Sequence, residues 1–153
     1  MQKLKILNTR ELKHIKEKLK EQFDYEYKED FAFLLNEKNR LFVVNKDISR
    51  IEFKKIRVDK FGLYFGELKN EELRLSMEGS WLVGQKAKSN IIDLEIDEVK
   101  KYFLGENLEK DLGKSNKFVL IKYQGDILGC AKYKNKQILN FLPKIHRSKD
   151  LII

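Results

Sequence analysis

The sequence is poor in the residues that mark disulfide frameworks, metal sites and catalytic dyads. It contains one cysteine, Cys130, and two histidines, His14 and His146, among 153 residues. A single cysteine excludes an internal disulfide and is typical of a reducing, intracellular compartment. The sequence has no Cys/His pair with zinc-site spacing, no phosphate-binding loop and no glycine-rich dinucleotide fingerprint. We therefore expect no metal, no cofactor and no catalytic residue.

Long apolar runs are also missing. No stretch approaches the roughly 18 consecutive apolar residues that indicate a membrane-spanning helix, and the first residues lack the apolar core of a signal peptide. These absences predict a cytoplasmic protein with no membrane partner. The composition, 42% hydrophobic and 37% charged, supplies enough apolar mass for one ordinary domain or two small ones.

The sequence is rich in basic residues, and their distribution is uneven. The 32 Lys and Arg against 24 Asp and Glu leave a net charge of +8, which favours a polyanionic partner such as nucleic acid. Residues 114–150 contain nine basic and two acidic side chains, whereas residues 93–111 contain seven acidic side chains and three lysines. A solvated lysine-rich surface would explain the same excess, so charge alone leaves both interpretations open.

The first half of the chain combines one amphipathic helix with short apolar runs. Asn8 and Glu11 have the spacing of a capping box. After them, apolar residues recur at steps of three and four from Leu12 to Phe23, which predicts a helix with one apolar face. The other elements predicted in this half are two strands at 31–35 and 41–44, a short helix around Ile48, and a strand at 61–68.

A polar break at residues 69–72 predicts a domain boundary, which gives domains 1–70 and 71–153. After a strand at 91–96, Asp97 is predicted to cap a helix that ends at Gly105. The chain then closes with predicted strands at 118–123, 127–133 and 137–142. Because these strands follow one another through short polar turns, they predict a meander that curls into a small barrel.

Four residues with possible chemistry have no obvious partner in the sequence. Cys130 lies within a predicted strand and is interpreted as a small buried residue, not as a nucleophile. Trp81 is interpreted as a core residue, with base stacking as the alternative. His14 is expected to face solvent on its helix, whereas His146 lies among basic residues where it could assist RNA binding.

Residues 73–150 resemble a PUA domain, the small RNA-binding barrel of pseudouridine synthases, archaeosine transglycosylases and RNA methyltransferases. The segment Lys100-Lys-Tyr-Phe-Leu-Gly-Glu-Asn-Leu108 is similar to the helix and glycine-containing RNA-contact loop of that family. Residues 118–132 resemble its paired strands, and residues 137–144 resemble its closing strand. The order of elements in residues 31–76 resembles the Nip-seven family, ribosome-biogenesis factors with a pre-PUA and a PUA domain.

The resemblance implies an α+β N-terminal domain followed by a C-terminal PUA-type small mixed β-barrel with flanking short helices. It also implies a non-catalytic RNA-binding protein, an rRNA-binding factor in large ribosomal subunit biogenesis. The alternative is an accessory module that acts in trans with an RNA-modifying enzyme, such as an rRNA or tRNA methyltransferase or a pseudouridine synthase. The expected partners are RNA, which is rRNA or pre-rRNA, and ribosome-assembly or RNA-processing proteins that contact residues 1–70.

The predicted RNA contacts come from the last strand and the residues after it. The loop from Glu106 to Asp111 is acidic, unlike the usual loop of a PUA domain, and this shifts the prediction to the C-terminal basic residues. RNA is expected to run along the last strand and tail. The predicted RNA-binding residues are Lys132, Lys134, Lys136, Lys144, His146, Arg147 and Lys149.

Overall fold

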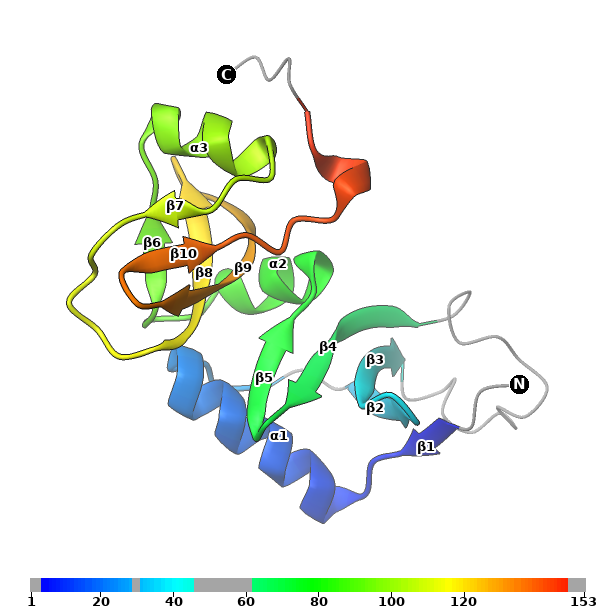
Figure 1. The fold of residues 1–153 in the computed structure, drawn as a ribbon. Helices are drawn as coiled ribbons and strands as arrows, with labels where there is room; N and C mark the ends of the chain where they lie inside the picture. Colours follow the sequence, from blue (N-terminus) through cyan, green and yellow to red (C-terminus); the bar gives the residue numbers. More distant parts are fainter. Residues whose placement is uncertain (1–3, 29–30, 46–61, 149–153) are drawn as a thin grey trace.

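The structure, a computed structural model, describes residues 4–28, 31–45 and 62–148 (Figure 1). These residues form two five-stranded sheets and three α-helices, a mixed α+β architecture. None of the helices in these ranges is long and apolar enough to cross a membrane. The short helix predicted around Ile48 lies outside the described residues.

The first sheet is antiparallel throughout and has the strand order β1-β2-β3-β4-β5. Helix α1 packs on one face, where Ile15, Leu19 and Phe23 join a core with Phe33 and Phe65. The elements are β1 (Leu4–Ile6), α1 (Thr9–Phe23), β2 (Phe31–Asn36), β3 (Arg40–Asn45), β4 (Leu63–Lys69) and β5 (Glu72–Leu75).

The start of α1 confirms the predicted capping box. The Asn8 side chain accepts a hydrogen bond from the Glu11 backbone N–H at 2.9 Å, and the Glu11 carboxylate accepts one from the Asn8 N–H at 3.1 Å. These bonds satisfy N–H groups that have no partner within the helix. The apolar face predicted for this segment is the one buried on the sheet.

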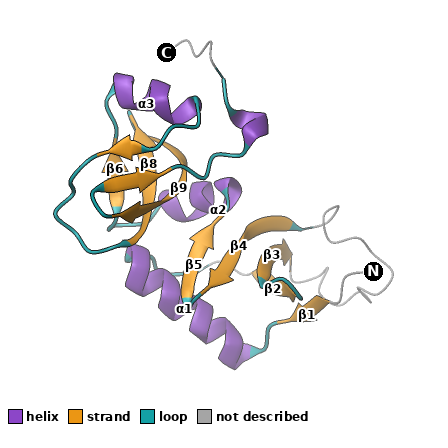
Figure 2. Ribbon diagram, in the orientation of Figure 1, coloured by secondary structure: helices purple, strands orange, loops and turns teal. Residues whose placement is uncertain are grey.

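The second sheet is mixed and curls into a half-barrel with the order β6-β8-β9-β10-β7 (Figure 2). Strand β6 pairs in parallel with β8, and the other pairs are antiparallel. Figure 1 shows α3 at one end of this sheet. The elements are β6 (Ile91–Asp93), α3 (Ile96–Phe103), β7 (Leu108–Glu109), β8 (Lys117–Tyr123), β9 (Asp126–Lys134), β10 (Gln137–Leu139) and the 3₁₀ turn η4 (Lys144–His146).

Helix α2 (Met77–Gly84) connects the two sheets and packs closely on both. A Cβ atom at Gly79 would lie 2.0 Å from the Phe65 carbonyl oxygen, and one at Gly84 would lie 2.4 Å from the Ile127 side chain. Only glycine permits these approaches. The two glycines therefore allow β4 and β9 to pack closely against the same short helix.

Three sequence predictions can be compared with this arrangement in detail. Trp81 was expected in the core, but its side chain is 46% exposed, so that prediction is wrong. The N-cap of α3 is Glu95 and not Asp97, because the helix begins at Ile96. The predicted boundary at residues 70–71 falls in the turn between β4 and β5, and the domain division stays a prediction.

Candidate nucleic-acid interface

The residues after β10 fold back onto the end of α3, and we call residues 140–148 the C-terminal segment. Gly105, just beyond α3, has a φ of +88°, a conformation that favours glycine. A Cβ atom at this position would lie 2.6 Å from Nε of Arg147. The same Nε donates a hydrogen bond to the Leu142 carbonyl at 3.1 Å. The Gly105 backbone thus forms the surface on which the Arg147 side chain lies.

Asn140 fastens the C-terminal segment to the loop that follows α3. Its side-chain amide donates to the carbonyls of Tyr102 at 2.7 Å and Glu106 at 2.9 Å. Its side-chain oxygen accepts from the Leu142 N–H at 2.8 Å, and its own N–H donates to the Asn107 side chain at 2.9 Å. Four hydrogen bonds through one residue make Asn140 the main positioning residue of this region.

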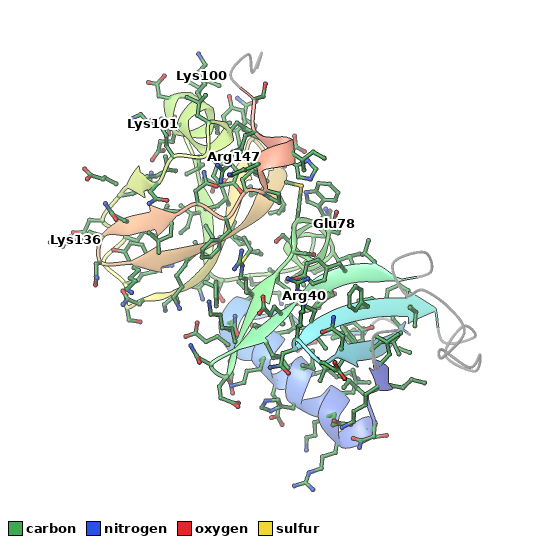
Figure 3. All side chains as sticks on the ribbon, turned by 45° about the vertical axis from the view of Figure 1, so that its right-hand side comes forward. Arg40, Glu78, Lys100, Lys101, Lys136 and Arg147 are labelled. Atoms are coloured by element: carbon green, nitrogen blue, oxygen red, sulfur yellow. The ribbon has the colours of Figure 1, made fainter. Side chains whose placement is uncertain are left out.

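Lys100 and Lys101 lie exposed in the last turn of α3. Figure 3 shows both at the end of the molecule where Arg147 lies. Positive side chains near a helix C-terminus interact favourably with the helix dipole. The two lysines therefore stabilise the end of α3. The sequence predictions omitted these two lysines from the site. The sequence did contain a signal for them, because two adjacent lysines lie near the end of the predicted helix, shortly before Gly105.

Lys144 and His146 belong to η4 in the C-terminal segment, and both are exposed. The Ser148 N–H donates to the Phe103 carbonyl at 2.9 Å, which anchors the segment beyond Arg147. The two helix lysines and these residues form what we call the basic surface. Its members are Lys100, Lys101, Lys144, His146 and Arg147.

The predicted RNA-binding residues do not all come together. Lys134 and Lys136 are exposed at the turn between β9 and β10. Figure 3 shows Lys136 well apart from Arg147, at the opposite end of β10. Lys134 and Lys136 are therefore separate from the basic surface, although they lie close in sequence to its C-terminal members.

Lys132 has its own partners within the protein. Its Nζ lies 2.6 Å from the Glu72 carboxylate and 4.5 Å from the centre of the Phe118 ring. These contacts join β9 to β5 across the two sheets, so its ammonium group is already neutralised in part. Its role in RNA binding stays a prediction, as does that of Lys149, which lies outside the described residues.

Glu98 and Lys110 form an ion pair behind the acidic loop, with 3.0 Å between Nζ and the carboxylate. Burial raises the pKa of the Glu98 carboxyl, but hydrogen bonds from the Glu95 N–H and from Lys110 outweigh it and hold that pKa below its usual range. The carboxylate of Glu98 in α3 is therefore balanced by Lys110, the one basic residue of the acidic loop.

The Glu98 pair predicts a pH-dependent contribution to stability. A lowered folded-state pKa stabilises the protein above the unfolded-state pKa of about 4.3, and this stabilisation is lost as the pH falls through the folded value. Glu98→Gln should lower the free energy of unfolding by about 0.5–1 kcal/mol at pH 7, and this difference should shrink toward pH 3. Urea unfolding at both pH values measures it, with Glu109→Gln, an exposed residue of β7, as control. An equal deficit at both pH values would contradict the assignment.

The described residues offer little for catalysis. Cys130 is buried, as predicted, and burial raises the pKa of its thiol to about 12, so it is protonated at neutral pH. His14 is exposed, as predicted, and lies 3.4 Å from Glu71. Within the described ranges there is no group of three or more His, Cys, Asp or Glu side chains that could hold a metal ion.

The curled sheet, its helix and its glycine loop define the class of this part of the chain. Residues 89–148 match the protein-family model described as Methyltransferase RsmF PUA domain, so they form a PUA-type domain. The structure thus confirms the coarse fold prediction for the C-terminal half, a small mixed sheet that curls and carries short helices.

The more particular similarity is to one group of bacterial enzymes. The chain is 27% identical over 100 residues to ribosomal RNA small subunit methyltransferase F of Aeromonas hydrophila, and the match covers 65% of this chain. It is 29% identical over 104 residues to the protein of the same name from Vibrio parahaemolyticus, covering 63% of this chain. In each case the match spans 21% of the relative's length. The resemblance to the Nip-seven family gains no support from these relatives.

Proposed function

We propose that this protein is a non-catalytic RNA-binding module that binds ribosomal RNA through the basic surface. The observation that carries the proposal is the packing of Arg147 on the Gly105 loop. This contact brings the lysines of α3 and the basic residues of the C-terminal segment together on a PUA-type domain. A rigid group of cations suits a phosphate backbone, because each phosphate that is neutralised releases counterions.

The comparisons favour the second of the two predicted functions. The relatives are named as small-subunit rRNA methyltransferases, and the family match covers a PUA domain. We therefore propose an accessory module of rRNA methylation in preference to a factor for large-subunit biogenesis. In this role the module holds rRNA while the methyl transfer takes place on a separate catalytic domain. Residues 1–70 are the proposed contact for that protein partner.

Fluorescence anisotropy with labelled rRNA fragments tests the proposal. We expect binding to small-subunit rRNA that weakens steeply between 50 and 200 mM salt, on the order of tenfold or more for several phosphate contacts. Large-subunit fragments of equal length are the control for target choice. Absence of RNA binding at low salt would overturn the proposal. Tighter binding to the large-subunit fragments would favour the first predicted function instead.

A pull-down from cell extract tests the partner. We expect the tagged protein to recover an RNA methyltransferase, and we expect this recovery to survive nuclease treatment because it depends on a protein contact. Recovery of large-subunit precursors without a methyltransferase would contradict the accessory role.

The exposed Glu106 next to the basic surface predicts a gain of affinity. Its backbone is fixed by Asn140, so its carboxylate stays beside the site where phosphates are proposed to bind. Glu106→Gln should tighten RNA binding about two- to threefold, because one exposed like-charge repulsion is removed. Anisotropy at low salt measures the change, and Glu37→Gln on the first sheet should leave affinity unaltered. Weaker binding by Glu106→Gln would show that this carboxylate contacts RNA favourably.

A further inference from the structure

A pocket of about 280 Å³ lies where the two sheets meet, next to the basic surface. Strands β4 and β5 and the start of α2 form one wall, and the PUA-type domain forms the other. His146 belongs both to this pocket and to the basic surface, so the two features are continuous. The polar and aromatic residues that line the pocket include Tyr64, Arg74, Glu78, Tyr102, Phe141 and His146.

The Tyr102 hydroxyl is the most unusual group in the pocket. The residue is 1% exposed, and its hydroxyl makes no hydrogen bond to another described residue. A Cβ atom at Gly129 would lie 2.7 Å from this hydroxyl, so the glycine leaves room for it. Burial raises the pKa of Tyr102, which keeps the hydroxyl protonated and able to donate. A protonated phenol hydroxyl among the residues that line a pocket can donate a hydrogen bond to a ligand there.

Arg74 and Glu78 give the pocket one cation and one anion. The Arg74 guanidinium carbon lies 4.0 Å from the centre of the Phe141 ring, a stacked arrangement that leaves the N–H groups at the guanidinium edge available. Among the described residues, neither Arg74 nor Glu78 has an ion-pair partner within 4.0 Å. Figure 3 shows Glu78 on the side of the junction that faces the PUA-type domain.

We infer that this pocket binds a single unpaired nucleotide whose base carries an exocyclic amino group. The inference rests on the proposed function, because the basic surface would hold the backbone of the same RNA. The pocket lies near the lower limit of about 300 Å³ for small-ligand sites, so it suits one base and excludes a duplex. The Tyr102 hydroxyl and the Glu78 carboxylate bind the base edge, where a carboxylate accepts hydrogen bonds from an amino group. Arg74 and His146 face the phosphate at the entrance.

This assignment gives the first sheet a direct part in RNA recognition. Single-stranded RNA is commonly recognised through bases that leave the stack and enter pockets with aromatic walls. Here, six of the thirteen lining residues come before position 79, outside the part of the chain that matches the PUA family. The first sheet would therefore select an unpaired position in the RNA, while the basic surface supplies most of the affinity.

Titration of the ¹⁵N-labelled protein with the four nucleoside 5′-monophosphates tests the inference. We expect CMP, AMP and GMP to shift the backbone amides of Met77, Gly129 and Leu142, and we expect UMP to shift them less. Tyr102→Phe should weaken this binding about fivefold, the loss of one hydrogen bond. Tyr123→Phe, on β8 outside the pocket, is the matched control. Because the Tyr102 hydroxyl has no partner within the described part of the chain, Tyr102→Phe should unfold at the same temperature as the wild type.

Three outcomes would overturn the inference: no shift of these amides at millimolar nucleotide, equal binding by Tyr102→Phe, or equal binding of UMP. Arg74→Leu provides a second variant, since it keeps an apolar contact with Phe141 and should lose affinity for the phosphate. The RNA anisotropy experiment is independent of this titration. A protein that binds rRNA but none of the mononucleotides would refute the pocket and leave the proposed function standing. A protein that binds mononucleotides but no RNA would refute the proposed function and leave the pocket as a nucleotide site.

Discussion

Replacing Lys101, Lys144 and Arg147 together by alanine should lower the affinity for rRNA about 30- to 100-fold at 0.15 M salt, the loss of about three phosphate contacts. The slope of log affinity against log salt should become shallower by about two to three. The physical reason is that these three residues meet on one surface and release counterions together. Anisotropy titrations at four salt concentrations measure both quantities.

A second triple variant that loses the same charge elsewhere distinguishes binding at the basic surface from attraction by the overall charge. Lys13, Lys38 and Lys69 are exposed on the first half of the molecule and have no ion pair among the described residues. Their triple alanine variant should lose only about two- to threefold, through the change in net charge. An equal loss in both triple variants would mean that RNA is attracted by the overall charge and that the basic surface has no special role.

Asn140→Ala should lower the free energy of unfolding by about 2–3 kcal/mol, because it removes three side-chain hydrogen bonds at about 1 kcal/mol each. The groups affected are the carbonyls of Tyr102 and Glu106 and the N–H of Leu142. RNA affinity should fall as well, since the loop after α3 and the C-terminal segment would no longer be fixed to each other. Urea unfolding and anisotropy measure the two effects.

Asn107→Ala is the matched control for this variant, because it removes a single hydrogen bond, the one from the Asn140 N–H. Its cost should be about 1 kcal/mol, with a smaller effect on RNA binding. If Asn140→Ala proved no less stable than Asn107→Ala and bound RNA with wild-type affinity, Asn140 would not be the positioning residue that its contacts indicate.

The parts of the fold that could be predicted from sequence depend on neighbouring residues. The capping box at Asn8 and Glu11 and the apolar stripe that follows it need only the helix itself to be recognised. The turns after β8 and β9 and the stop at Gly105 are likewise local, since each needs a backbone conformation that few residues adopt. Strands in which apolar and polar residues alternate, or in which apolar residues are continuous, could also be recognised, because these patterns are local.

The parts that escaped prediction depend on contacts between distant segments. Strands β1, β5 and β7 are short, and each is defined by the strand beside it more than by its own sequence. Trp81 looked like a core residue by composition, but α2 buries its glycine and serine face on the sheets and leaves the tryptophan outside. No local pattern shows which face of a helix this short will be buried.

The candidate site could be predicted only in part, because it too depends on contacts between distant segments. The basic residues of the C-terminal segment were recognised from charge, whereas Lys100 and Lys101 join them only because the chain folds back over Gly105. The acidic loop appeared to exclude the end of α3 from the site, yet Asn140 holds that loop directly against the basic segment. Tyr102 and Arg74 could not be connected from sequence, because they line one pocket from α3 and from β5, which are distant in the chain.

Ultraviolet crosslinking of the protein to a small-subunit rRNA fragment, with the crosslinked peptides identified by mass spectrometry, tests the central claim most directly. The basic surface predicts crosslinks in peptides that contain residues 100–107 and residues 140–147. Crosslinks confined to the β9–β10 turn at Lys134 and Lys136, or to α1, would contradict it.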